Sequence, residues 1–119
     1  GRQDPVCSFG VGLDYVTFGI GLTDFDKPVL EDWRKLLDLD ADRMGRLLGA
    51  GEAAGFAYWA PALKRVPPPH GADHPMERFL RMKGLVATRD LGPGPDVGTR
   101  LLAAVEDGRP VLAALAPVL

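Results

Sequence analysis

Nucleophilic side chains are scarce in this chain of 119 residues, since Cys7 is its single cysteine and Ser8 its single serine. One cysteine permits neither an internal disulfide nor a cysteine-rich zinc site. Cys7 occupies an apolar strand position, where an inert thiol is expected, and no Gly-x-Ser-x-Gly pattern surrounds Ser8. Covalent catalysis is therefore not expected. The lack of cysteine pairs fits a reducing, cytoplasmic location.

Long hydrophobic runs are also missing. No apolar run approaches the roughly 20 residues that a bilayer-spanning helix needs, and no signal peptide is visible, so no membrane partner is expected. Hydrophobic residues make up 46% and charged residues 25%, which is the balance of a globular protein. We expect one domain over residues 1–119, with residues 1–5 frayed. Because the first residue is Gly1 rather than Met, the chain either stands alone or is cut from a longer protein.

The formal net charge of −2 hides an uneven distribution of sign. Residues 63–89 contain six basic and two acidic side chains, an excess of +4, so the remainder carries −6. Such asymmetry has two interpretations. It marks a site for an anion or a partner protein, or it is a solvated basic face balanced by acidic helices. Nucleic acid is not expected as a partner, because the whole chain is acidic and no nucleic-acid-binding motif is present.

Hydrophobic alternation predicts an N-terminal β-hairpin over residues 7–22. A two-residue turn at residues 14–15 would pair Leu13 with Val16 and Val11 with Phe18, which places the large apolar residues on one face. Glycine recurs on the opposite face, where it indicates either close packing and sheet curvature or the floor of a ligand site.

Helix-start and helix-stop signals divide the remaining chain. A helix is predicted from Pro28 to about residue 37, with Leu30, Trp33 and Leu37 inward, and a second from the cap Asp40 to about residue 54. The later elements are a strand over residues 56–59, a helix over 75–83, a strand over 85–89, and a final helical stretch broken near residues 108–110. This order predicts an α+β fold, with a curved antiparallel sheet (the hairpin plus two short strands) packed with four or five helices.

Basic residues suggest a site for an anionic ligand. Lys64 and Arg65 are adjacent, and Arg78 and Arg81 would share one face of a helix whose N-terminus begins at Pro75. Two neighbouring aromatic residues, Tyr58 and Trp59, either line a pocket for a planar ligand or belong to the core.

The sequence His-x-x-Asp-His, formed by His70, Asp73 and His74, is the one local pattern with metal-ligand character. His70 lies in a Pro/Gly-rich loop and His74 at a helix start, so exposure and helix capping explain them without a metal. We predict no metal and no cofactor. Acid–base chemistry by these histidines, with Lys64 and Arg65, stays open because histidine titrates near neutral pH.

Four stretches carry a family resemblance: GIGL, ALKRVPPPHGADHP, FLRMKGLVATRDL and GRPVLAAL. They resemble an uncharacterised bacterial family catalogued as domain of unknown function 2461, over most of residues 9–119 and most strongly over 62–91. The N-terminal aromatic-rich segment usual in that family is absent, so the chain resembles its C-terminal two-thirds. The resemblance supports the fold and brings no established activity.

Three functions remain on this evidence. The first is a non-catalytic module that binds a small anionic or planar ligand, or a protein partner, through Tyr58, Trp59, Lys64, Arg65, His70, His74, Arg78 and Arg81. The second is an enzyme of undefined reaction that uses His70, Asp73 and His74 with Lys64 and Arg65. The third is an interaction domain that completes a homo-oligomer or a larger protein. The fold class alone does not choose among them.

Overall fold

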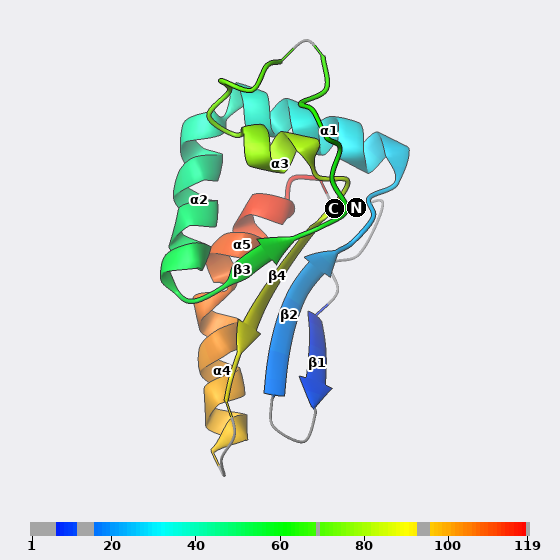
Figure 1. The fold of residues 1–119 in the computed structure, drawn as a ribbon. Coiled ribbons are helices and arrows are strands. Elements are labelled where there is room, and N and C mark those ends of the chain that lie inside the picture. Colours follow the sequence, from blue (N-terminus) through cyan, green and yellow to red (C-terminus); the bar gives the residue numbers. More distant parts are fainter. Residues whose placement is uncertain (1–6, 12–15, 69, 93–95, 119) are drawn as a thin grey trace.

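The computed structural model describes residues 7–11, 16–68, 70–92 and 96–118 (Figure 1). Its strands are β1 (Cys7–Val11), β2 (Val16–Leu22), β3 (Ala57–Trp59) and β4 (Leu85–Asp90). Its helices are α1 (Lys27–Leu39), α2 (Ala41–Ala53), α3 (Glu77–Arg81), α4 (Val97–Asp107) and α5 (Arg109–Leu115). The predicted α+β class and element order are confirmed. Across these residues, no helix combines the length and the apolar character that crossing a membrane requires.

The strands form an antiparallel sheet in the order β1-β2-β4-β3. Within the hairpin, Val11 pairs with Val16 and Phe9 with Phe18, so the predicted register is wrong by two residues. A shift of two leaves every side chain on the same face, and hydrophobic alternation therefore cannot distinguish the two registers. The predicted turn at residues 14–15 lies outside the described residues.

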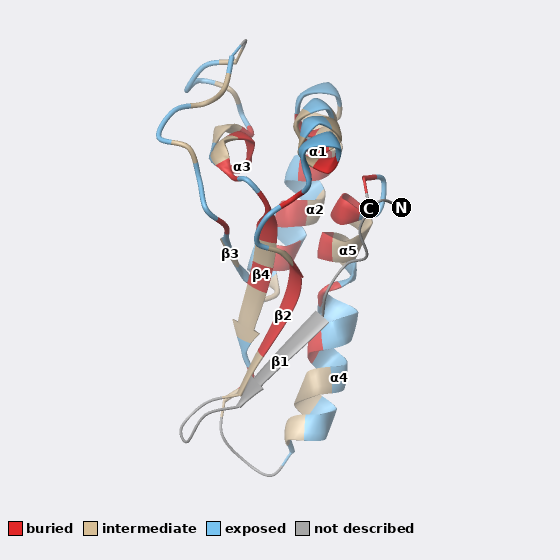
Figure 2. Cartoon of the chain, turned by 90° about the vertical axis from the view of Figure 1, so that its right-hand side faces the viewer, coloured by how far each residue is buried: buried red, intermediate tan, exposed pale blue. Residues whose placement is uncertain are grey.

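Helices α1, α2, α4 and α5 lie on one side of the sheet, as Figure 2 shows. On this side Phe18 and Ile20 of β2 are buried, and the ring of Phe18 packs edge-on against Phe56 with 6.3 Å between centroids. The other face carries the alternating glycines of β2. At Gly21, φ is +123° and a Cβ would lie 1.9 Å from the Leu85 carbonyl oxygen, so close approach of β4 requires glycine there.

Helix α1 buries one apolar stripe, formed by Val29, Trp33 and Leu37 at four-residue spacing. Trp33 and Leu37 were predicted to face inward, whereas the predicted Leu30 is only partly buried and Val29 occupies the core instead. Trp33 is fully buried and stacks edge-on against Phe25 at 5.9 Å. These contacts anchor α1 and thereby fix the position of its C-terminal turn.

Helix α2 packs closely against α5 and β3 through Gly51. A Cβ at Gly51 would lie 2.2 Å from the Tyr58 hydroxyl and 2.8 Å from Val111 Cγ2. The predicted stop at Gly55 is confirmed by its φ of +98°. The predicted break near residue 108 is also confirmed, because α4 ends at Asp107 and α5 begins at Arg109.

Helix α3 is shorter than predicted. It begins at Glu77 rather than at Pro75, and it ends at Arg81. Pro75 disfavours the α conformation for the preceding residue, and the chain enters α3 through a tight turn in which the Glu77 N–H donates to the His74 carbonyl at 3.0 Å. The predicted inward residues Phe79, Leu80 and Met82 are buried.

Candidate functional site

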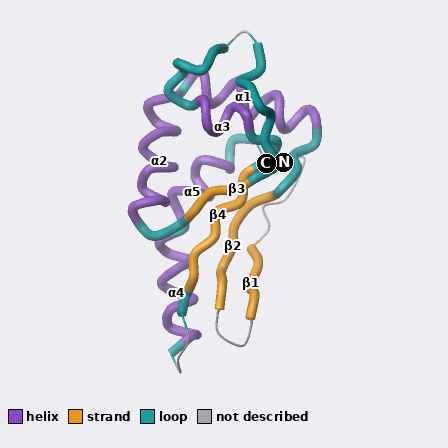
Figure 3. Tube along the Cα trace, viewed as in Figure 1, coloured by secondary structure: helices purple, strands orange, loops and turns teal. Residues whose placement is uncertain are grey.

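The loop between β3 and α3, residues 61–76, is called the proline segment below; Pro69 within it is not described. Figure 3 shows it leaving β3, passing beside α1 and returning to α3. Backbone hydrogen bonds hold its start, where the Leu63 N–H donates to the Arg81 carbonyl at 2.8 Å and the Lys83 N–H donates to the Pro61 carbonyl at 2.7 Å. The segment is therefore tied to the chain on both sides of Met82.

The proline segment and α3 enclose a cavity of about 400 Å³, called the basic pocket below. It is lined by Lys64, Arg65, Val66, Gly71, Ala72, Glu77 and Arg81. Three cations and one carboxylate give the lining a formal charge of +2. Arg81 Nε lies 3.1 Å from Glu77 Oε2, an ion pair without hydrogen-bond alignment. The structure thus brings together three of the predicted basic residues: Lys64, Arg65 and Arg81.

Arg78 does not join them. Its Nη2 donates to Glu52 Oε1 of α2 at 2.7 Å, and its guanidinium lies 4.5 Å from the centre of the Phe79 ring. Arg78 and Arg81 therefore do not converge on one cavity, because their side chains meet carboxylates on different elements, Glu52 of α2 and Glu77 of α3. The predicted helix start at Pro75, on which the proposed anion site at that N-terminus depended, is wrong, since α3 has only 5 residues and starts at Glu77.

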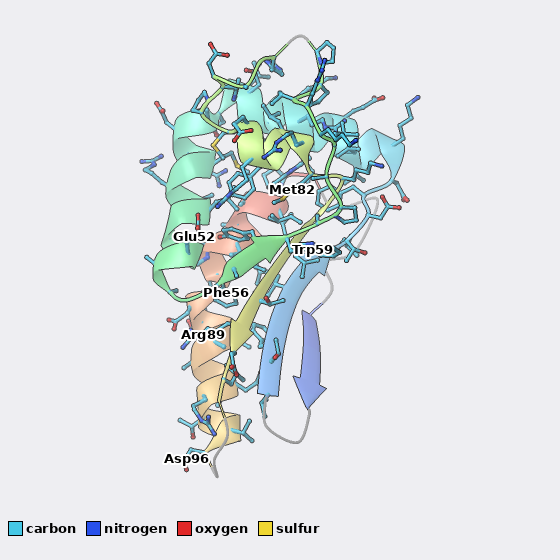
Figure 4. The ribbon with its side chains drawn as sticks, in the orientation of Figure 1. Glu52, Phe56, Trp59, Met82, Arg89 and Asp96 are labelled. Carbon is cyan, nitrogen blue, oxygen red and sulfur yellow. The ribbon has the colours of Figure 1, made fainter. Side chains whose placement is uncertain are left out.

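Tyr58 and Trp59 lie on opposite faces of the sheet, because successive strand residues alternate. The Tyr58 hydroxyl donates to the Leu48 carbonyl at 2.6 Å on the helix side. Burial raises the pKa of Tyr58 to about 12, the nearby Glu52 carboxylate adds to the rise, and Arg78 opposes it. Trp59 is 59% exposed at the end of β3 (Figure 4). A single aromatic pocket lined by both residues is therefore excluded.

The two histidines meet a carboxylate that the sequence analysis missed. His74 Nε2 lies 2.9 Å from Asp38 Oδ1, and His70 Nδ1 lies 3.7 Å from the same oxygen. The Met76 N–H donates to His74 Nδ1 at 3.0 Å, so Nε2 carries the proton and donates it to Asp38. The helix-capping role expected of His74 is wrong, because His74 holds the turn before α3 and the N-cap Met76 makes no side-chain cap hydrogen bond. We call Asp38, His70 and His74 the His–Asp cluster.

Asp73 lies outside that cluster and is exposed. One signal could have identified Asp38 instead. It is an acidic residue in the last turn of α1, where the helix dipole disfavours negative charge, so its presence there calls for a cationic or hydrogen-bonding partner. Nothing in the local sequence indicates that His70 and His74 supply it.

A second cavity, of about 540 Å³, opens beside the His–Asp cluster and is called the α1 cavity below. It is lined by Glu31, Arg34, Lys35, Asp38, Leu39, Pro67, Pro68, His70 and Leu80. Arg34 Nε donates to the Leu80 carbonyl at 3.1 Å, and burial lowers the pKa of its guanidinium. The proline segment therefore contributes to two cavities, the basic pocket and the α1 cavity.

The fold and these sites define an α+β domain in which one polar loop borders both a cationic pocket and a His–Asp cluster. Comparison by sequence adds the family. Residues 2–116 match the family described as "Conserved hypothetical protein (DUF2461)", so the chain belongs to that family. The match starts at residue 2 rather than 9, and its extent over essentially the whole chain does not support the narrower resemblance to the C-terminal two-thirds. No curated protein and no solved structure gives a significant match. Membership assigns no activity.

Proposed function

We propose that this chain is a non-catalytic binding module for a small anionic ligand, held in the basic pocket. The observation that carries the proposal is the convergence of Lys64, Arg65 and Arg81 on one cavity that contains a single carboxylate. By contrast, Arg78, Arg89 and Arg109 each pair with a carboxylate outside this pocket, as Arg89 does with Asp107 at 2.6 Å. A surplus of positive charge at a cavity favours an anionic ligand. The scarcity of cysteine fits a cytoplasmic location for such a module.

The pocket also fits the ligand in size and in chemistry. A volume of about 400 Å³ lies in the usual range for small-molecule sites, about 300–1,000 Å³. Arginine offers paired N–H donors that match a carboxylate or a phosphate group, while lysine adds a point charge. Lys64 and Arg65 are both exposed, which leaves their head groups accessible to a ligand from solvent.

Titration with inorganic phosphate at low ionic strength, followed by amide NMR shifts, tests this function. The amides of residues 64–66, 71, 72 and 81 should shift together in one saturable process. Lys64→Met or Arg65→Met should weaken binding about tenfold, since a charge-assisted hydrogen bond contributes about 1.5–3 kcal/mol and 1.4 kcal/mol is tenfold. Lys83→Met is the matched control, because Lys83 is exposed nearby but does not line the pocket. Equal weakening by Lys64→Met and Lys83→Met would contradict the proposal.

An enzyme is the second candidate, favoured by the placement of His70 and Asp38 on the larger α1 cavity. His74 is a poor base here because both of its ring nitrogens are engaged in hydrogen bonds. An acid–base role therefore falls to His70 with Asp38, rather than to the predicted set with Asp73. His70→Ala distinguishes the candidates. Phosphate binding at the basic pocket should survive that substitution, whereas an enzyme would lose turnover of any substrate found.

A further inference from the structure

We infer that Asp38, His70 and His74 bind a divalent transition metal whose open coordination position faces the α1 cavity. Each residue offers a ligand atom, and within the described part of the chain these atoms all lie within 4.8 Å of one another. Asp38 comes from the last turn of α1, and both histidines come from the proline segment. The inference does not rest on the basic pocket, since it shares no residue with that pocket.

The distances between ligand atoms match those around a metal ion. Bonds of about 2.0–2.2 Å to imidazole and carboxylate separate neighbouring ligand atoms by about 3–3.5 Å. Two separations in the structure, 2.9 Å from Asp38 Oδ1 to His74 Nε2 and 3.7 Å from the same oxygen to His70 Nδ1, bracket that interval. Asp38 Oδ1 therefore lies at about the distance from both imidazoles that a shared ion requires.

The ligand types select the class of metal. Two imidazoles and one carboxylate favour zinc and its first-row neighbours, whereas magnesium and calcium prefer sites made wholly of oxygen ligands. Three protein ligands also leave at least one position open, as in catalytic rather than structural zinc sites. Because Asp38 and His70 both line the α1 cavity, that position is reached from the cavity.

Two hydrogen bonds of His74 oppose the metal. The Met76 N–H donates to His74 Nδ1, which places the imidazole proton on Nε2. Coordination through Nε2 requires the proton to leave that atom and Nδ1 to take one up, so the Met76 N–H loses its acceptor. Two hydrogen bonds, from the Met76 N–H to Nδ1 and from Nε2 to Asp38, are exchanged for three coordination bonds, and the exchange favours the metal. Metal binding should therefore change the tautomer of His74 and shift the NMR signal of the Met76 amide, and these two changes identify the site.

Calorimetric titration of the chain, free of any polyhistidine tag, with Zn²⁺ tests the site. One equivalent should bind, and Mg²⁺ should not. Asp38→Asn and His70→Ala should each weaken zinc binding at least 30-fold, and both substitutions leave the Met76–His74 hydrogen bond in place. Asp73→Asn is the matched control, because it removes the same charge from the segment that carries both histidines but lies outside the cluster, and it should stay within twofold of the unaltered chain.

Two results would overturn the inference. The first is an equal zinc affinity of the Asp38→Asn and Asp73→Asn variants, which would mean that zinc binds to the protein surface and not to the cluster. The second is a His74 ring that remains protonated at Nε2 in nitrogen NMR spectra of the zinc-saturated protein, because His74 would then not be a ligand. Circular dichroism of each variant confirms that a loss of affinity does not reflect a loss of fold.

Discussion

The sheet with its covering helices differs from the proline segment in how each is held together. The sheet and helices bury an apolar core, and among the described residues no polar or charged side chain is fully buried. Trp33, Leu37 and Met44 are each 0% exposed. The proline segment contributes little to that core. It is fixed by backbone hydrogen bonds that join Pro61 to Lys83 and Leu63 to Arg81, and by the His74–Asp38 contact.

This difference means that the core supplies stability, whereas the proline segment carries the candidate functional groups. Apolar burial is non-directional and distributed over many contacts, so it supplies most of the folding free energy. The segment depends on a few directional contacts, and it brings cations and histidines to cavities without burying their charge. Functional groups concentrate on such loops because a rigid scaffold can position them there. Substitutions in the two regions should therefore have effects of different size and kind.

The two tryptophans give the largest test of this contrast. Trp33→Ala removes a fully buried side chain from the core and should lower the free energy of unfolding by about 3–5 kcal/mol. Trp59→Ala is the matched control, since Trp59 is 59% exposed, and should change it by no more than about 0.5 kcal/mol. Urea unfolding followed by circular dichroism measures both. Similar losses in the two variants would mean that the open face of the sheet is covered by packing as tight as that of the core.

The fold was largely predictable because its signals are local. Pro28, Asp40 and Gly55 mark the ends of α1 and α2 in sequence, and the apolar periods distinguish strands from helices. The hairpin register was missed, since a two-residue shift preserves the same buried face. The start of α3 was missed because a turn, rather than a helix, follows Pro75.

The candidate site was less predictable because its geometry depends on distant segments. No local pattern links Asp38 to His74, which lies 36 residues further along the chain. Likewise, Arg78 and Arg81 look equivalent in sequence, yet the position of α2 gives Arg78 a carboxylate at Glu52 and leaves Arg81 at the basic pocket. Sequence thus identified the loop that carries the candidate site residues, whereas tertiary contacts determined how those residues are grouped.

His74 gives the next largest effect and tests how the segment is fixed. His74→Ala removes the acceptor of the Met76 N–H and the link to Asp38, and should cost about 1–2 kcal/mol, because each of these hydrogen bonds contributes about 0.5–1.5 kcal/mol. Hydrogen exchange should accelerate at the amides of Phe79 and Leu80, which bond to the Met76 carbonyl. Asp73→Ala, in the same turn, should leave both measurements nearly unchanged. Unaltered exchange at α3 in His74→Ala would show that the core alone orders this helix.

Tyr58 lies where the two regions join and gives the smallest effect, which depends on pH. Its pKa is about 12 in the folded chain, because burial, and then Glu52, disfavours the phenolate, against about 10 when unfolded. Between these values the unfolded chain loses the Tyr58 proton first, so the contribution of Tyr58 to stability is complete below pH 10 and declines as pH rises toward 12. Since the ring is partly exposed, the decline should be on the order of 1 kcal/mol, below the full 1.36 kcal/mol per pKa unit.

The comparison with Tyr58→Phe isolates that decline from the titration of other groups. At pH 8 the substitution should cost about 0.5–1.5 kcal/mol through loss of the hydrogen bond to the Leu48 carbonyl. That cost should shrink between pH 10 and pH 12, because only the unaltered chain has a Tyr58 proton to lose. Ultraviolet titration of a Tyr15→Phe variant, which leaves Tyr58 as the only tyrosine, should give a pKa near 12. The prediction fails if the pKa of Tyr58 is near 10 and the stability cost of Tyr58→Phe does not change with pH. Tyr58 would then be as exposed to solvent as the proline segment, and not part of the core.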